Sequence, residues 1–423
     1  MINYKRLISA SFLLTFAGLT MAQTSTNSPY TRYGFGQLSD QGFGNNKAMG
    51  GLAYGLRNGN QINAANPASY TAVDSLTFLF DVGMTLQNAN FKEGNVKTNA
   101  KNSSFDYLAM QFRLWKRMGM TVGFLPYSTV GYSLYNTGKL TQDENGNTIN
   151  TIASYAGDGG LQQVFVGLGY KVFNNLSVGA NISYLYGDIT HSVSTAFSTT
   201  DSYTSIRMDK ISISDYKVDF GLQYTYKFNK KHALNFGAVY SLGHSMNGTG
   251  YNYIQKYSNS DASSTQTVDT IKNAFSLPHT FGAGLTYVYD NRLTVGVDYT
   301  LQKWADTKFY NKEGVFENRS KISVGAEFVP NSYSHNYLKR IRYRAGGYYS
   351  DPYAKVDGKE GAREYGVSLG FGLPVFQSRS VLNISGQYIK VSPKVKGMLE
   401  ENYLRVNIGL TFNERWFMKW KVD

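Results

Sequence analysis

The chain has no cysteine among its 423 residues, which excludes disulfide scaffolds, thiolate metal sites and cysteine nucleophiles. Its five histidines are scattered, so no histidine-rich metal site is expected. Prolines number only 8, and charged residues make up 17% of the chain, below the roughly 25% of a typical soluble domain. After the N-terminal stretch, no apolar run approaches the roughly 18 residues that a membrane helix needs.

Glycine and aromatic residues are abundant instead, with 43 Gly, 34 Tyr and 25 Phe. Polar residues recur at alternating positions between them. This combination is typical of a membrane β-barrel, in which one face of each strand meets lipid and the other meets the lumen.

Residues 1–22 have the features of a secretory signal peptide. Lys5 and Arg6 form its charged region, Leu7–Leu19 is apolar, and Thr20–Ala22 offers small residues before a cleavage site. A membrane anchor is the alternative, but the stretch is shorter than the roughly 20 residues that span a bilayer. An exported chain without membrane helices crosses a membrane only as a closed barrel. In that compartment no nucleic-acid partner is expected, despite a net charge of +13.

Alternation with a period of two residues is the main structural signal, as in Leu404–Phe412, where every second residue is apolar. A soluble sandwich would bury its apolar face, whereas a barrel turns that face to lipid. We predict strands at 75–87, 104–116, 118–134, 161–172, 176–190, 211–228, 232–249, 276–289, 292–304, 320–329, 340–350, 364–373, 380–391 and 402–413.

The connections between these segments alternate in length. Short turns, such as those at Lys116–Arg117 and Asp290–Asn291, are followed by longer loops. The longer loops are predicted at 88–103, 135–160, 191–210, 250–275, 305–319, 351–363 and 392–401. The alternation predicts an all-β fold, a 14-stranded antiparallel transmembrane β-barrel over residues 75–423. We place it in the outer membrane of a Gram-negative bacterium, in contact with outer-membrane lipids and with both termini periplasmic.

Residues 23–74 precede the first strand and show almost no alternation. They are rich in Gly, Asn, Ala and Ser, which would also suit a disordered periplasmic leader. The apolar residues within Ala48–Leu56 give the stretch something to bury. A barrel of this size is too wide for wall side chains to fill, so we predict that residues 23–74 form an N-terminal hatch in the lumen.

Two runs, Ala48–Ala53 and Asn63–Tyr70, resemble the hatch of the FadL/TodX family of outer-membrane β-barrels. The opening Ser28–Gly36 is similar to a Bacteroidetes-type subgroup. The resemblance implies a hatch, a 14-stranded barrel and periplasmic termini. It places the hatch signature at Gly50, Gly51, Asn66, Pro67 and Ala68.

Pro126 lies within the third predicted strand. Proline cannot donate to a sheet, so it should mark a bulge or a kink. In FadL-like proteins a kink in the same strand opens a lateral hole, and the resemblance carries such an opening to Leu125, Pro126, Tyr127 and Ser128. A harmless bulge near the barrel rim is the alternative.

Arg340, Arg342 and Arg344 fall on one face of the eleventh predicted strand, opposite in phase to apolar neighbours. We expect this basic ladder to face the lumen. It could attract anions, but pairing with lumen carboxylates that help to hold the hatch is the favoured interpretation. The candidate carboxylates are Asp81, Asp219, Asp298, Glu327 and Glu364.

No Ser-His-acid or H-E-x-x-H pattern is present, so neither an enzyme nor a cofactor or metal site is expected. The resemblance implies uptake or binding of a hydrophobic small molecule through the hatch and the lateral opening. Against this, the 135–160 loop is polar, whereas an importer of such cargo should present an apolar loop. The alternative is a non-transporting barrel subunit of an outer-membrane assembly, secretion or surface-lipoprotein export complex, with other outer-membrane proteins or surface lipoproteins as partners.

Overall fold

The computed structural model describes residues 26–142, 148–199, 202–260, 263–375, 379–395 and 397–415. The signal peptide predicted at 1–22 lies outside the described residues, and the predicted hatch is described from residue 26 onward. In the described ranges, no helix is both long and apolar enough to cross a membrane.

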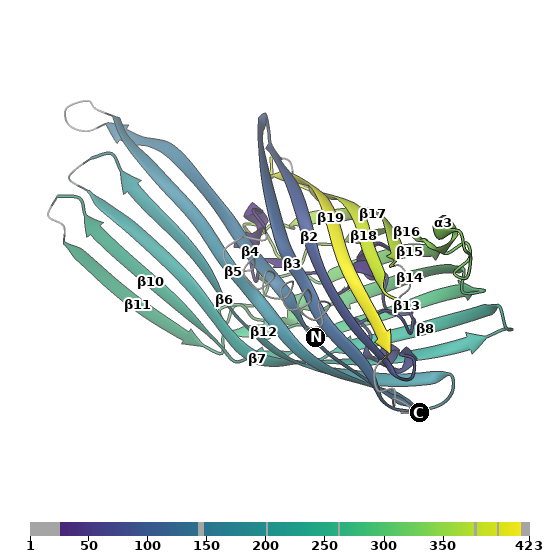
Figure 1. Cartoon of the computed structure of the whole chain (residues 1–423). Coiled ribbons are helices and arrows are strands. Elements are labelled where there is room, and N and C mark those ends of the chain that lie inside the picture. The colour runs from purple at the N-terminus through teal and green to yellow at the C-terminus, as the bar shows by residue number, and fades with distance from the viewer. Residues whose placement is uncertain are drawn as a thin grey trace, which may run out of the picture.

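Fourteen strands of the described chain pair in antiparallel order around one ring (Figure 1). They are β2 (Thr77–Glu93), β3 (Val96–Trp115), β4 (Met118–Gln142), β5 (Thr148–Lys171), β6 (Leu176–Phe197), β7 (Tyr203–Lys227), β8 (His232–Ser241), β13 (Thr280–Tyr289), β14 (Leu293–Gln302), β15 (Arg319–Phe328), β16 (Arg342–Ser350), β17 (Ala362–Pro374), β18 (Val381–Pro393) and β19 (Glu400–Arg415). The ring closes where β19 pairs with β2, from Glu400 beside Lys92 to Arg415 beside Thr77. The predicted 14-stranded antiparallel barrel is therefore confirmed.

The remaining elements lie inside the ring or extend beyond its ends. They are η1 (Pro29–Arg32), β1 (Gln37–Leu38), α2 (Gly44–Lys47), η2 (Pro67–Ala72), β9 (His244–Met246), β10 (Gly248–Ser258), β11 (Ser264–Lys272), β12 (Phe275–Leu277), η3 (Trp304–Asp306) and α3 (Tyr337–Arg340).

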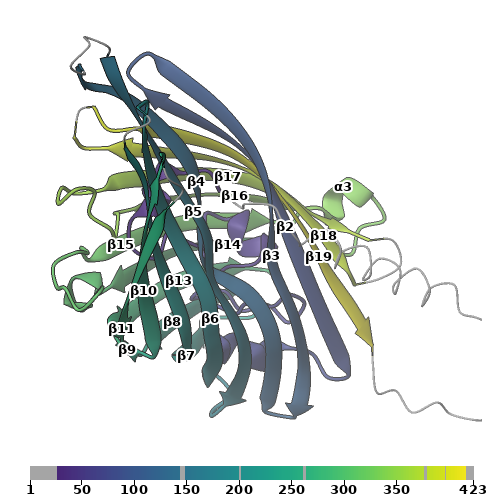
Figure 2. The same ribbon diagram turned by 90° about the vertical axis from the view of Figure 1, so that its left-hand side faces the viewer.

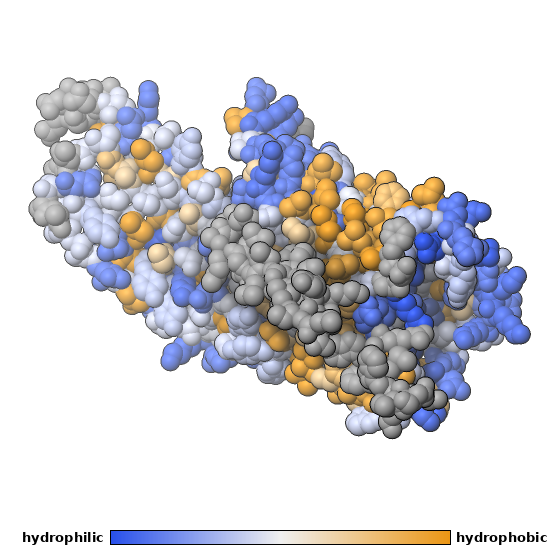
Figure 3. Space-filling view, in the orientation of Figure 1, coloured by the Kyte–Doolittle hydropathy of each residue, from blue (hydrophilic) through white to orange (hydrophobic). Residues whose placement is uncertain are grey.

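The outer surface of the barrel carries an apolar band, visible in orange in Figure 3. On β19, Leu404 and Val406 are 54% and 38% exposed, whereas the alternate residues Tyr403 and Asn407 are buried. The same alternation exposes Val295 and Val297 on β14. A closed barrel with apolar residues outside and polar residues inside is the arrangement that meets lipid on one side and the lumen on the other.

The two ends of the barrel differ. Tight turns join β3 to β4, β5 to β6, β7 to β8 and β13 to β14 at one end, which we call the turn end. We call the opposite end the far end. Strands β4 to β7 have total lengths of 22 to 25 residues and extend beyond the barrel there, whereas β13 to β16 have total lengths of only 9 or 10 residues. We call the extension the wing. It comprises 130–142, 148–159, 188–197, 203–213, β10 and β11, and it extends away from the barrel in Figure 1 as a continuation of the same sheet.

Four of the predicted long loops are wrong, since most of their residues form strands. The ranges 88–103, 135–160 and 191–210 are largely the ends of β2 to β7, and 250–275 holds the β10–β11 hairpin. The predicted strand 232–249 also ends early, because β8 stops at Ser241 and the chain steps across to pair β10 with the upper part of β7. Most residues of these extensions are polar or glycine, so apolar alternation does not mark them clearly.

Candidate functional site

Residues 26–76, which we call the N-terminal segment, lie inside the ring of strands (Figures 1 and 2). Asn66 caps η2, because its side-chain oxygen accepts a hydrogen bond from the Ala68 amide at 3.1 Å. Pro67 occupies the first turn, where a missing N–H is tolerated. Gly50 and Gly51 follow α2 with φ of +67° and +85°, a backbone conformation that favours glycine. The residues predicted for the hatch thus form two tight turns, and their role in gating stays a prediction.

Many of the wall residues that contact the N-terminal segment are glycines. A Cβ atom at Gly325 of β15 would lie 2.8 Å from Met49 Cβ, and one at Gly169 of β5 would lie 2.7 Å from Pro67 O. Similar contacts recur on most strands of the ring. The glycines that make them, the glycine belt, are Gly119, Gly167, Gly169, Gly179, Gly221, Gly237, Gly282, Gly284, Gly296, Gly325, Gly346, Gly370 and Gly409. Backbone and side-chain atoms of the segment therefore pack directly against the backbone of the wall, which fixes the segment across the lumen.

Polar side chains from the wall also bind the backbone of the N-terminal segment. Asp298 of β14 accepts hydrogen bonds from the amides of Ala53 at 2.6 Å and Tyr54 at 2.8 Å. On the other side of the ring, Gln387 of β18 donates to the Lys47 carbonyl at 2.8 Å. Buried backbone groups need such partners because water does not reach them.

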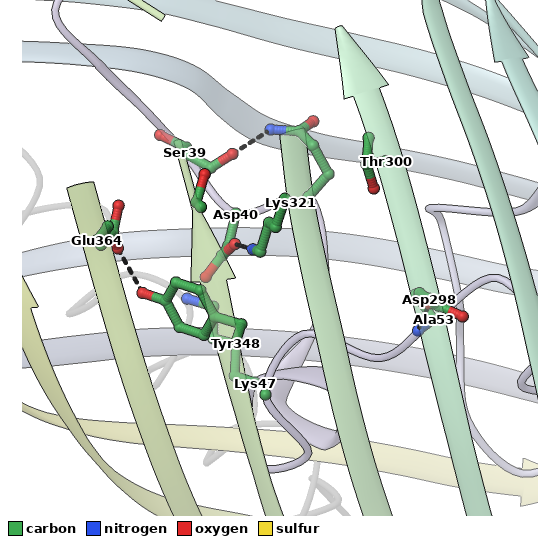
Figure 4. A network of polar contacts seen from close by, with 12 residues as sticks. Ser39, Asp40, Lys47, Ala53, Asp298, Thr300, Lys321, Tyr348 and Glu364 are labelled. Atoms are coloured by element: carbon green, nitrogen blue, oxygen red, sulfur yellow. Dashed lines mark hydrogen bonds and ion pairs between the residues drawn. The ribbon is translucent and has the colours of Figure 1, made fainter. Parts of the chain in front are cut away.

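Two ion pairs join the segment to the wall, and Figure 4 shows the one between Lys321 and Asp40. Lys47 contacts Asp106 of β3 at 2.7 Å, and Lys321 of β15 contacts Asp40 at 2.8 Å. The Lys321 ammonium holds the pKa of the Asp40 carboxyl well below its usual range. Lys47 and Asp106 are each about nine-tenths buried, so removal of one charge would leave the other without an opposite charge beside it.

The far end of the lumen is closed by an apolar core centred on Phe35 of the N-terminal segment. Phe35 is fully buried, and its ring centroid lies 5.3 Å from that of Phe309 and 6.0 Å from that of Trp304. The buried members of this core are Phe35, Tyr127, Val130, Tyr132, Leu161, Leu185, Ile189, Ile211, Ile213, Met246, Ala274, Phe275, Leu277, Trp304, Phe316 and Tyr353. They come from the base of the wing, the short-strand side and the segment, so the far mouth is packed rather than open.

A line of bends crosses the wall at the base of the wing. The pairing of β4 with β5 shifts register between Pro126 and Ser128. Directly beside this point, Gly159 and Gly160 of β5 have φ of +108° and +147°, and Gly187 of β6 has +149°. These are conformations that L side chains rarely adopt, so the wall turns outward here at glycines.

The wall also separates between β3 and β4, and we call this separation the seam. The two strands pair from Trp115 and Met118 only as far as Leu108 and Phe124. Beyond that point β3 stays paired with β2, and β4 stays paired with β5.

The N-terminal segment takes the place of β3 along the next part of β4. The Ser39 amide donates to the Tyr127 carbonyl at 2.9 Å, and β1 pairs with Ser128 and Thr129. Higher on β4, the Gly131 amide donates to Thr31 Oγ1 at 3.2 Å.

A cavity of about 670 Å³ lies at the seam. Its lumen side is polar and charged, with Lys47, Asp106 and Arg405 among the lining residues, whereas Phe105 and Phe124 line it at the outer face. Pro126 also lines this cavity. Of the residues predicted for a lateral opening, Leu125 and Tyr127 face the apolar cores of the interior, and Ser128 is buried at the pairing with β1.

The basic ladder is shorter than predicted. Arg342 and Arg344 lie on β16 and bind Glu327 of β15 at 3.0 Å and 2.7 Å. Arg340 lies in α3, where its guanidinium stacks 5.5 Å from the Tyr337 ring, so it does not belong to the strand. The helical turn ends one residue before β16 begins. The other predicted carboxylates bind hydroxyl, amide or lysine groups: Asp81 with Thr411, Asp219 with Lys217, Asp298 with Ala53, and Glu364 with Tyr348.

Sequence reasoning missed Phe35, the glycine belt and the seam. The glycine belt could have been noticed in the sequence, since glycine recurs at inward positions of strand after strand. The pattern becomes visible only when all strands are compared, because one or two glycines in a single strand are not unusual. Phe35 lies between two glycines in a segment without periodicity, so no sequence pattern indicated that its side chain is buried. In the described residues, no group of three His, Asp or Glu side chains could hold a metal ion.

Solved structures similar to this chain include two toluene transporters and a FadL homologue. The Pseudomonas putida toluene transporter TodX is 15% identical, with a TM-score of 0.58 over 90% of this chain and 100% of that chain. The Ralstonia pickettii toluene transporter TbuX is 14% identical, with a TM-score of 0.56 over 89% of this chain and 99% of that chain. A Pseudomonas aeruginosa FadL homologue is 13% identical, with a TM-score of 0.57 over 91% of this chain and 100% of that chain.

These similarities confirm the predicted FadL/TodX-like barrel fold, and at such identities they show the fold alone. No curated protein sequence matches the chain. The model of one protein family, described as BamG, matches residues 1–423. Since that match spans the whole chain, the protein belongs to the BamG family.

Proposed function

We propose that this protein is an integral outer-membrane barrel that does not conduct solutes and serves as a subunit of an outer-membrane assembly, secretion or surface-lipoprotein export complex. The observation that carries this proposal is the double closure of the lumen. The apolar core around Phe35 fills the far mouth, and the N-terminal segment is fixed across the middle by the glycine belt.

Opening such a lumen would be costly. A shift of the segment would expose Phe35 and the aromatic rings packed on it, at about 1.5–3 kcal/mol for each large side chain. It would also leave Asp298 and Asp106 without the amides and the ammonium that now bind them. A hatch that opens for each passing solute should be held more weakly.

The wing supports a role in protein contact. Its strands rise beyond the apolar band, and on the face that Figure 3 shows its surface is largely pale or blue with a few orange patches. With the turn end in the periplasm, both termini would be periplasmic and the wing would stand at the cell surface, where it could meet a surface lipoprotein or another outer-membrane protein.

The test has two parts. First, the protein is extracted from its own membrane in mild detergent, without overexpression, and examined by native mass spectrometry. Second, the purified chain is placed in liposomes, and the entry of a sugar and of toluene is measured. We expect a stoichiometric assembly with other proteins and entry no faster than into empty liposomes. A monomer that carries lipid-like mass and speeds toluene entry would overturn the proposal.

A second candidate function is the binding or lateral passage of an outer-membrane lipid or a hydrophobic molecule at the seam. The cavity beside Pro126 favours it, because that cavity joins the charged lumen to apolar residues of the outer face. Phe124→Glu would place a charge at the apolar side and should abolish such binding. If lipid-like mass is retained by this variant, the second candidate is rejected.

A further inference from the structure

The wing is an open sheet, so it has two edge strands, and the two edges differ in composition. One edge is β11, which pairs with β10 and carries Asp269 and Lys272. The other edge is β4 at the seam, where the stretch Val130–Gly138 contains no charged residue and no proline. Charges on an edge strand prevent other chains from pairing with it, so β11 is protected and β4 is not.

The edge of β4 already accepts an added strand. The N-terminal segment pairs with Ser128 and Thr129 through β1, and Thr31 binds both the amide and the carbonyl of Gly131. In the described residues this pairing stops at Gly131, whereas β4 itself continues to Gln142.

Beyond Gly131, every second residue of β4 also directs its backbone N–H and C=O groups toward the seam. Hydrogen-bonding groups of a strand alternate sides with a period of two residues, so those of Ser133, Tyr135 and Thr137 face the seam in phase with Gly131. Tyr135 is 79% exposed and Leu134 is 39% exposed, so the surrounding surface is open.

We propose that an extended segment of another protein pairs with Tyr132–Gly138 of β4 at the seam and continues the sheet where β1 ends. This deepens the proposed function, on which it rests, by naming the surface through which the complex forms. Main-chain hydrogen bonds would supply affinity, as in other cases of strand addition.

Charge indicates the chemistry of that segment. The two strands that border the seam carry exposed lysines at Lys97, Lys101 and Lys139, and the carboxylate of Asp106 is already paired with Lys47. An uncharged or acidic strand therefore fits better than a basic one. A second copy of this chain, with its net charge of +13, is disfavoured for the same reason.

The experiment compares two preparations of the full mature chain, one extracted from its own membrane in mild detergent and one refolded alone. Hydrogen exchange of the amides in 132–138 should be slowed on the order of tenfold or more in the extracted form. A photoreactive phenylalanine analogue in place of Asn136 should form an adduct with a different protein in the extracted form.

Variants separate backbone pairing from side-chain contact. Tyr135→Pro removes a seam-facing amide but no bond to β5, so it should abolish the adduct and the slow exchange. Tyr135→Ala keeps the amide and should retain both. Val268→Pro on the protected edge β11 is the matched control and should leave the adduct unchanged. Heat-modifiable gel mobility shows that each variant is folded.

Each other result overturns the inference. An adduct with lipid, with a second copy, or with residues 23–27 of the same chain would show that something other than a partner protein occupies the edge of β4. Fast exchange at 132–138 within an intact assembly would reject the inference while the proposed function stands. A chain that is alone when extracted and that speeds toluene entry would reject the proposed function itself.

Discussion

The two sides of the barrel differ in the length of their strands and in the continuity of their wall. On the side formed by β13 to β16, strands of 9 or 10 residues cross the apolar band and end. On the side formed by β4 to β7, strands of 22 to 25 residues continue into the wing, and the wall bends at glycines and separates from β3. The strands of the short side are just long enough to cross the membrane. The strands of the long side are longer than the membrane requires, and their extra length forms the wing.

The N-terminal segment joins the two sides. It packs on the glycine belt all around the ring, it carries Phe35 into the core between the wing and the short side, and it lies along β4 where β3 has departed. If the difference between the sides depends on this segment, changes in it should affect the long side first.

The largest effect is expected for Phe35→Ala. Removal of this fully buried ring should destabilise the protein by about 3–5 kcal/mol through lost burial and the cavity left behind. The measurement is the denaturant midpoint of the barrel in detergent. Tyr333→Ala, at a side chain that is 95% exposed, is the control and should change little. Equal midpoints for the two variants would show that the far mouth is not a stabilising core.

A slightly smaller effect is expected for Lys47→Met, which leaves the buried Asp106 carboxylate unpaired on β3. The loss should reach about 3 kcal/mol, and the double variant Lys47→Met/Asp106→Leu should recover part of it. A double-mutant cycle on the denaturant midpoint measures the coupling. No recovery in the double variant would show that the pair does not link the segment to β3.

Gly325→Ala tests the glycine belt on the short side. The new methyl group would press on Met49 and cost about 1–3 kcal/mol. The N-terminal segment should then become accessible to protease, and native mass spectra would show its cleavage. Gly386→Ala on β18 is the matched control, because a Cβ atom there meets nothing within 4 Å. Equal cleavage in both variants would contradict a fixed segment.

The smallest effect is expected for Pro126→Ala. Stability should change by no more than about 1 kcal/mol, and the seam should persist because β1 and the glycines of β5 and β6 also hold it. Since the chain lacks cysteine, spin labels at Lys101→Cys and Tyr135→Cys report the distance across the seam. A shortening in the Pro126→Ala background would identify the proline as the cause of the separation.

The sequence by itself determined the barrel. Alternating residues such as those of Leu404–Phe412 require one apolar and one polar face, and a closed ring is the way to satisfy every backbone group in lipid. The positions of the fourteen strands followed from this local rule. So did the expectation of a bulge or kink at Pro126, where the pairing with β5 shifts register, since a missing amide is a property of one residue.

Only the tertiary structure decided the wing, the seam and the closed mouth. The residues of 135–160 have no apolar alternation, and those described, 135–142 and 148–160, form strands because their neighbours pair with them. Arg340 left the predicted ladder because a helical turn precedes β16. Phe35 and Trp304 are far apart in sequence and meet only once the ring has closed. Pairing and packing between distant segments depend on the whole chain, so local patterns do not reveal them.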